Sequence, residues 1–229
     1  GTDPALKDSQ DRWYGTHRSP LAILFNRNEL TRDTAPKTWD ELLDPKWAGR
    51  IALRKPLASG TMRTFLCAMI ARAPSVDEGI AWLERLDKAT ESYPESPQFL
   101  FDHIKRNPGL ISVWLMPDVV LQRERNGYPF DFTVPAGTPV LTEGIAIVQG
   151  APHGKWARTF YEFVTTREAL VHQAKAYAKL PARTDIAPDE LPPWMAEQPI
   201  DAMPIDWPRF AENESAWCGR WETEVYAKR

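Results

Sequence analysis

The stretch from Arg50 to Pro74, RIALRKPLASGTMRTFLCAMIARAP, changes its hydrophobic period halfway along. Ile51 and Leu53 alternate with other residues, which is the period of a β-strand. From Met62 onward, apolar residues recur at intervals of three and four, the spacing of one helical face. Small, uncharged residues separate the two parts. The stretch therefore predicts a strand, a Ser-Gly-Thr turn and a helix that begins at the turn.

The turn itself, Ser59-Gly60-Thr61, has two interpretations. The first backbone N–H groups of a helix lack intrahelical acceptors and carry partial positive charge, so such a turn can bind an anion. A glycine there lets a ligand approach the main chain, and the two hydroxyl groups add donors. Alternatively, Ser59 or Thr61 only caps the helix. The three residues alone do not separate these interpretations.

Strands and helices alternate along the rest of the chain. Capping boxes predict helices that start at Thr38 and at Ser75, and Ser96-Pro97 starts another with proline at the first helical position. The alternation predicts an α/β fold with a mixed or parallel sheet. Strand-sized apolar runs lie at 21–26, 110–116, 130–134 and 144–148, helices are expected at about 155–165, 167–178 and from 208 onward, and the proline-rich stretch 181–208 is expected to be irregular.

The composition limits the classes of function. The chain has 229 residues, of which 43% are hydrophobic and 26% charged, as in an ordinary globular protein with a buried core. Its net charge is −3 with interspersed signs, which argues against nucleic acid or an anionic membrane as the main partner. No apolar run reaches membrane-spanning length, and residues 1–12 lack the pattern of a secretory signal.

Enzyme motifs are missing from the sequence. The four histidines lack metal-ligand spacing, and neither a phosphate-binding loop nor a hydrolase or metalloprotease signature occurs. Ser59, at a strand-to-helix turn, could act as a nucleophile only with a neighbouring base, and the sequence nominates none. Cys67 and Cys218 are far apart and form no C-x-x-C pattern; the sequence leaves a disulfide between them open, and we predict free thiols.

Four segments carry a family resemblance: RWYGTHRSPLAILFN, APKTWDELLDPKWAGRIALRKPLASGT, VLTEGIAIVQGAPHGKWARTFYEFVTTREA and KLPAR. In order and spacing they resemble family-1-type extracellular solute-binding proteins. These are the two-lobed receptors of bacterial ABC importers for ferric iron, 2-aminoethylphosphonate, phosphoglycerate and related anions. The resemblance runs from about Arg12 to the C-terminus, and it implies an α/β, type II periplasmic-binding-protein fold with the ligand in a cleft between the lobes.

The resemblance also implies a domain organisation. Residues 1–26 would hold the N-terminal segment and a first hinge strand at Leu21–Asn26. Residues 27–143 would form a complete second lobe, and 144–229 a second hinge strand at Gly144–Val148 with the C-terminal helices of a partial first lobe. Family members begin with about a hundred further residues of the first lobe, a domain's worth of chain. The sequence is therefore expected to be trimmed or naturally short.

A partial first lobe would leave apolar helix faces without their sheet. Five aromatic residues should normally pack there: Trp156, Phe160, Phe163, Trp217 and Trp221. Soluble monomers rarely expose so large an apolar patch. We therefore expect a second chain or the missing N-terminal segment to cover it, or a rearranged or disordered tail.

The matching ligand positions are the Ser59-Gly60-Thr61 turn, Trp114 at a strand end, the Gly137-Thr138 loop and Arg18 beside the hinge. A helix N-terminus and an arginine suit an anion, and an aromatic wall suits the body of a ligand. Three of these positions have an alternative role: Arg18 as a surface residue, Trp114 as a core residue and Gly137 as part of a turn. Ferric-binding members carry adjacent tyrosines where this chain has VWLMPD at 113–118, so we expect no iron; no other metal and no cofactor is predicted.

The resemblance implies a non-catalytic periplasmic receptor for a small organic anion, either a phosphonate, a phosphate ester or a carboxylate. Its lobes would close over the ligand and present the closed form to an ABC permease in the membrane. A regulatory domain of the same fold, reporting its ligand to a membrane sensor, would have the same site. A Ser59-dependent hydrolase is a third hypothesis, which requires a base within hydrogen-bond reach of Ser59.

Overall fold

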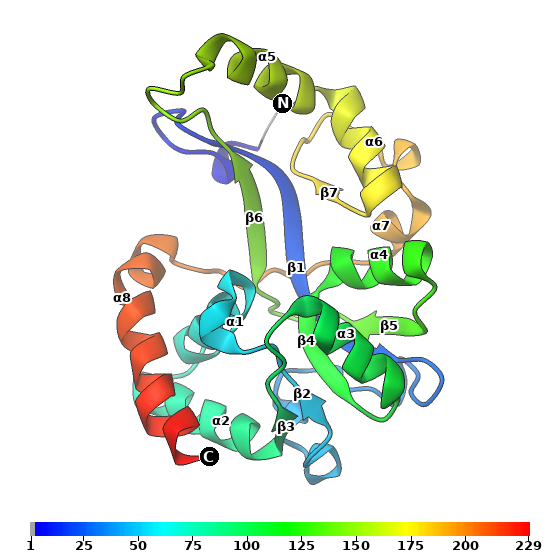
Figure 1. Ribbon diagram of the computed structural model, residues 1–229, viewed down its shortest axis with the longest axis vertical. Coiled ribbons are helices and arrows are strands. Elements are labelled where there is room, and N and C mark those ends of the chain that lie inside the picture. Colours follow the sequence, from blue (N-terminus) through cyan, green and yellow to red (C-terminus); the bar gives the residue numbers. More distant parts are fainter. Residues whose placement is uncertain (1–2) are drawn as a thin grey trace. The chain divides into compact units, whose positions relative to one another are not determined.

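The computed structural model describes residues 3–229, which divide into two compact units (Figure 1). Unit 1 holds the chain up to Pro20 together with Val140–Ile200, and unit 2 holds Leu21–Pro139 and Asp201–Arg229. The chain passes between the units after Pro20, after Pro139 and after Ile200. Of the helices in residues 3–229, none is both long and apolar enough to span a membrane.

Unit 2 is built on a sheet with the strand order β3-β2-β4-β1-β5. Its strands are β1 (Tyr14–Asn26, of which 21–26 belong to this unit), β2 (Ile51–Ala52), β3 (Thr90–Ser92), β4 (Ile111–Leu115) and β5 (Phe130–Thr133). β2 pairs in parallel with β3 and β4, whereas β1 is antiparallel to β4 and β5. The four strands other than β1 therefore run in one direction, and their carboxyl ends lie at one edge of the sheet.

The core of unit 2 surrounds the second half of β1. Leu21–Phe25 are completely buried, because this strand lies inside the sheet and is covered on both faces. Phe65 lies between Trp39 and Trp82, with ring centroids 5.4 and 6.3 Å away. Four helices of this unit lie between β2 and β5 in sequence: α1 (Gly60–Ala71), α2 (Val76–Ala89), α3 (Pro97–Arg106) and α4 (Met116–Asn126).

Three helices of unit 2 begin where their capping serines predict. The hydroxyl groups of Ser59, Ser75 and Ser96 accept hydrogen bonds from the backbone N–H groups of Met62, Glu78 and Phe99. Thr38 likewise accepts from the N–H of Glu41, but the element that follows is only a 3₁₀ turn, Asp40–Leu43. The predicted helix there is cut short because Asp44-Pro45 starts a second 3₁₀ turn, Pro45–Trp47.

The C-terminal segment belongs to unit 2, not to the part of the first lobe with which the sequence analysis groups it. Helix α8 (Trp207–Arg220) lies along α1, and a π-helical turn, Trp221–Val225, contacts α2 before a last 3₁₀ turn at Tyr226–Lys228 (Figure 1). Trp217 and Trp221 are buried there, so the tail covers its own apolar face on the flank of α1 and α2.

Unit 1 contains the first half of β1, residues 14–20, paired antiparallel with β6 (Val140–Ile145) and β7 (Leu180–Pro181). The strand predicted at 144–148 is therefore displaced. Pairing starts at Pro20↔Val140 and ends at Tyr14↔Ile145, and Ile147 and Val148 lie beyond it with exposed side chains. The helices of this unit are α5 (Gly154–Val164), α6 (Arg167–Tyr177) and α7 (Pro193–Glu197), and 3₁₀ turns lie at Pro4–Leu6 and Pro188–Glu190.

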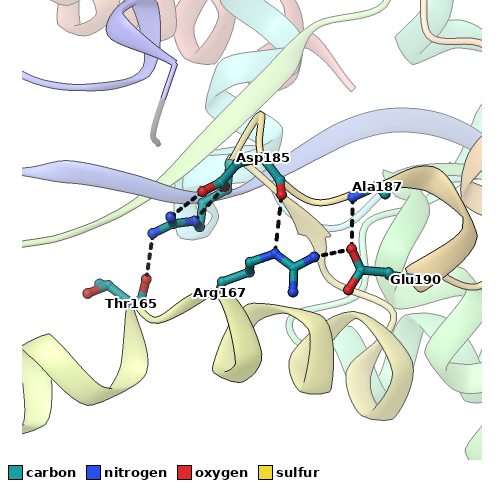
Figure 2. A network of polar contacts seen from close by, with 6 residues as sticks. Thr165, Arg167, Asp185, Ala187 and Glu190 are labelled. Carbon is teal, nitrogen blue, oxygen red and sulfur yellow. Dashed lines mark hydrogen bonds and ion pairs between the residues drawn. The ribbon is translucent and has the colours of Figure 1, made fainter.

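The proline-rich segment after β7 is mostly irregular, as predicted, and polar contacts attach it to α6 (Figure 2). Arg167 at the start of α6 donates to the carbonyl of Asp185 and pairs with Glu190. Arg183 donates to the carbonyl of Thr165 and forms two hydrogen bonds with the Asp185 carboxylate, 2.8 and 2.6 Å long. These contacts fix the conformation of a segment that has few backbone hydrogen bonds of regular secondary structure.

Candidate functional site

The predicted binding segments of unit 2 meet at one edge of its sheet. The Ser59 turn follows β2, Trp114 lies near the end of β4, and the Gly137-Thr138 loop follows β5. These three strands end at the same edge, where ligands of open α/β sheets bind. The Thr138 hydroxyl donates to the carbonyl of Leu21, which is paired with Leu115 in β4. The edge is therefore a single connected piece of structure.

The Ser59 turn supplies both a cap and free donors. Ser59 is buried, and its oxygen accepts the N–H of Met62 at 3.4 Å, which leaves its own hydroxyl proton available. Gly60 and Thr61 are the first two residues of α1, and within residues 3–229 their N–H groups have no acceptor. A Cβ at Gly60 would meet only the Arg63 guanidinium, at 3.9 Å, so there is open space beside the Cα of Gly60.

Arg54 is a residue of this edge that the sequence analysis missed. Its guanidinium carbon lies 5.9 Å from the centroid of the Trp114 ring, and its Nη2 donates to the carbonyl of Ala58 at 3.3 Å. Its Nε is buried without a hydrogen-bond partner, and no carboxylate among the described residues pairs with it. An uncompensated positive charge therefore lies between the Ser59 turn and Trp114.

Nothing in the sequence distinguishes Arg54 from its neighbour Lys55. Lys55 forms an ion pair with Glu95, 3.0 Å long, and is thereby compensated. The only sequence feature that could have pointed to Arg54 is its position, two residues after the strand that leads into the Ser59 turn. Which of the two cations lacks a partner depends on β3 and α3, far along the chain.

Trp114 is mainly a core residue. It is 3% exposed, its indole N–H donates to Asp118 at 3.0 Å, and its ring meets Phe101 edge-on at 5.8 Å. So little exposed surface offers no broad aromatic wall. What the ring provides at this edge is a fixed support for the Arg54 guanidinium.

The Gly137-Thr138 loop is held by the surrounding chain. Gly137 has a φ of +64°, which favours glycine, and its carbonyl accepts from the indole of Trp39. Thr138 is fully buried: its N–H donates to the carbonyl of Asp201, and its carbonyl accepts from the N–H of Met203. With its hydroxyl also bound to Leu21, Thr138 anchors the loop and has no donor left for a ligand.

Arg18 belongs to unit 1 and is not part of the group at the sheet edge. It is exposed on β1 and lines a cavity of about 300 Å³ together with residues of the same unit, among them Leu180, Ile186, Leu191 and Met195. The three predicted binding segments that lie at one sheet edge therefore all belong to unit 2.

The surroundings of the Ser59 hydroxyl and the arrangement of possible metal ligands can be described for residues 3–229. In the part of the chain that the structure describes, no three His, Cys, Asp or Glu side chains are grouped as metal ligands. The only hydrogen bond of the Ser59 side chain in residues 3–229 is the one to the N–H of Met62. A serine nucleophile needs a histidine or carboxylate as its base, and none is bonded to this hydroxyl.

Comparison with known proteins agrees with this architecture. A family model described as bacterial extracellular solute-binding protein matches residues 3–213. A putative 2-aminoethylphosphonate-binding periplasmic protein of Salmonella typhimurium is 21% identical over 96% of this chain and 67% of its own length. The chain spans between 55% and 67% of the length of the curated relatives it matches.

Two solved structures share the fold. AfuA of Actinobacillus pleuropneumoniae, a periplasmic binding protein with fructose-6-phosphate bound, superimposes with a TM-score of 0.82, 19% identity and coverage of 98% of this chain and 73% of that one. A ferric binding protein from Campylobacter jejuni superimposes with a TM-score of 0.80 and 18% identity, and the match covers 98% of this chain and 73% of that one. The match over residues 3–213, on a fold that periplasmic binding proteins share, shows that the chain belongs to the bacterial extracellular solute-binding protein family.

Proposed function

We propose that this chain is the ligand-capturing part of a periplasmic receptor of an ABC importer, and that it binds a small organic anion such as a phosphonate, a phosphate ester or a carboxylate. One observation carries the proposal: the uncompensated Arg54 guanidinium beside the free N-terminal amides of α1. Two relatives support the ligand class, because one is named for 2-aminoethylphosphonate and one was solved with fructose-6-phosphate.

In this proposal the anionic group of the ligand lies in front of Gly60. The N–H groups of Gly60 and Thr61 and the hydroxyl proton of Ser59 donate to its oxygen atoms, where the positive end of the α1 dipole also acts. Arg54 adds a full positive charge beside these donors and would donate through its guanidinium. Since β2, α1 and the Trp114 ring already hold these groups, binding would cost little ordering entropy.

A regulatory domain of the same fold would use the same groups and would differ only in its membrane partner. Stimulation of a purified importer's ATPase by the liganded receptor would separate the two roles. Iron uptake is named for one relative and ferric binding for one similar structure, but residues 113–118 hold no tyrosine. We therefore expect no visible tyrosinate-to-iron absorption with ferric citrate, and a strong band with near-stoichiometric iron would contradict the proposal.

The test is the substitution Arg54→Gln, with Arg27→Gln as the matched control. Arg27 is an exposed arginine of unit 2 that follows the other end of β1, and its side chain has no hydrogen bond or ion pair among residues 3–229. A thermal-shift panel with 2-aminoethylphosphonate, fructose-6-phosphate and inorganic phosphate selects the anion for titration calorimetry.

We expect Arg54→Gln to weaken binding of the selected anion by about 10- to 100-fold, the loss of one charge-assisted hydrogen bond. Arg27→Gln should leave the Kd unchanged. An unchanged Kd in Arg54→Gln, or a panel in which no anion raises the melting temperature, would overturn the proposal.

A further inference from the structure

The two cysteines of the chain face each other in unit 2. Cys67 on α1 and Cys218 on α8 are 151 positions apart in sequence, yet their sulfur atoms are 3.9 Å apart. Both are buried, with exposed fractions of 0% and 6%. We propose that Cys67 and Cys218 form a dithiol–disulfide site, which under oxidising conditions closes to a disulfide between α1 and α8.

The two helices hold the thiols in register. One turn before Cys67 lies Arg63, and one turn before Cys218 lies Glu214, and these two side chains form an ion pair with an N–O distance of 2.6 Å. Residues four apart share one face of a helix, so the ion pair and the thiol pair are consecutive contacts along the same helix–helix seam. To reach the bond length of a disulfide, about 2.05 Å, the sulfur atoms must approach by roughly 2 Å.

The pair is accessible from one side. Cys218 lines a surface cavity of about 490 Å³ together with Leu57, Arg63, Glu214 and Glu222. The two thiols are in hydrogen-bond contact, and either can be the donor. Since Cys218 lines the cavity whereas Cys67 is fully buried, the Cys218 sulfur is the one that an oxidant reaches first, and its thiolate is the form that attacks disulfides.

The oxidant in this proposal is an organic disulfide, such as oxidised glutathione or the disulfide of a thiol oxidase. The Cys218 thiolate attacks one sulfur of the oxidant, its S–S bond breaks, and one thiol leaves. Cys67 then loses its proton and attacks the Cys218 sulfur, and the second thiol leaves. The two protein thiols are oxidised, and the oxidant is reduced to two thiols.

The crosslink would matter because of the chain it encloses. The loop closed between the two cysteines contains α1 through to α8, and closing so long a loop restricts the unfolded state strongly. It would also tie the helix that begins at the Ser59 turn to the C-terminal tail.

The experiment equilibrates the whole folded chain with reduced or oxidised glutathione, then unfolds it and labels free thiols with a maleimide. We expect two labels after reduction. After oxidation we expect none, with a monomer two hydrogen atoms lighter. The melting temperature should rise by roughly 10 °C on oxidation, fall back with dithiothreitol, and not respond to oxidation in the Cys67→Ala/Cys218→Ala double variant.

Single variants test the assigned order of attack. With oxidised glutathione, Cys67→Ala should accumulate a glutathione adduct on Cys218, whereas Cys218→Ala should form little adduct because Cys67 is fully buried. Two maleimide labels on the oxidised native chain, or only intermolecular dimers or glutathione adducts, would overturn the proposal.

Discussion

At the scale of single residues, Ser59 caps α1 and the neighbouring Gly60 and Thr61 carry the free amides. The two interpretations of the turn therefore do not exclude each other, since the cap uses the serine oxygen as an acceptor and an anion would use the donors. A substitution that keeps the cap but changes the charge in front of the amides separates the roles.

Ser59→Asp is that substitution. Aspartate caps a helix at least as well as serine, so the melting temperature should hold or rise. Its carboxylate would occupy the place of the ligand's own charge, and we expect the affinity for the selected anion to fall by about 100-fold or more, against about tenfold for Ser59→Ala.

Ser75→Asp is the matched control, because Ser75 caps α2 by the same hydrogen bond and is exposed. It should leave the anion affinity unchanged. Titration calorimetry and thermal melts on these variants test whether the Ser59 turn binds the anion. If Ser59→Asp binds the anion as tightly as the native chain does, the turn is only a cap.

At the scale of elements, two amphipathic helices have opposite outcomes. Helix α8 buries Trp217 on the flank of unit 2, whereas the aromatic face of α5 remains uncovered by the described residues. Trp156, Phe160 and Phe163 recur at intervals of four and three, so they share one face, and they are 68%, 62% and 68% exposed. We expect this aromatic stripe to be covered by another segment or molecule, since soluble monomers rarely expose so large an apolar patch.

The exposure of α5 predicts a measurable apolar surface. Replacing Trp156 and Phe160 by lysine should reduce binding of an apolar fluorescent dye severalfold, while the melting temperature changes little because the two rings bury little area. Phe99→Lys is the control, since Phe99 on α3 is 65% exposed and belongs to unit 2, away from the aromatic face of α5 in sequence. A large fall in melting temperature in the α5 variant would show that these rings are buried in solution.

At the scale of the molecule, the two units have very unequal cores. Of the described buried apolar residues, unit 1 contains Leu170, Ala174, Ala178, Leu180, Ala182 and Ile186, and the others belong to unit 2. Hydrophobic stabilisation scales with the area removed from water. We therefore expect two thermal transitions, with unit 1 unfolding first, which is a departure from two-state behaviour.

Acid should destabilise unit 1 in particular. Burial lowers the pKa of His17 from 6.5 to about 4, against the opposing effect of the nearby Glu143 carboxylate. Between these two pH values the unfolded chain binds a proton at His17 that the folded chain does not, so the free energy of unfolding falls as the pH falls, by about 3 kcal/mol at pH 4.

Glu143 adds to this effect at lower pH. Burial raises its pKa, but hydrogen bonds from Ser19 and Lys179 outweigh burial and leave it below the usual 4.5, so its contribution is lost below that pH. Calorimetric scans at pH 7, 5.5 and 4.5 should show the lower transition moving down, and less so in His17→Gln. Parallel shifts in the variant and the native chain would contradict the assignment to His17.

The sequence by itself determined the local structure and the family. Three helices begin where a capping serine predicts, at Ser59, Ser75 and Ser96. Each cap is a hydrogen bond between residues three apart, so this signal needs no tertiary partner. The strand-turn-helix of residues 50–74 follows from a change of hydrophobic period, which the backbone geometry imposes. The motif spacing pointed to solute-binding proteins, and the family match agrees.

Only the tertiary structure decided which of these features act together. Arg54 rather than Lys55 is left uncompensated because Glu95, after β3, reaches only one of them. Cys67 and Cys218 meet because α8 packs on α1, and β6 ends at Ile145 because its partner β1 begins at Tyr14. Each outcome depends on contacts between residues far apart in the chain, and hydrophobic periods and capping patterns carry no information about such pairings.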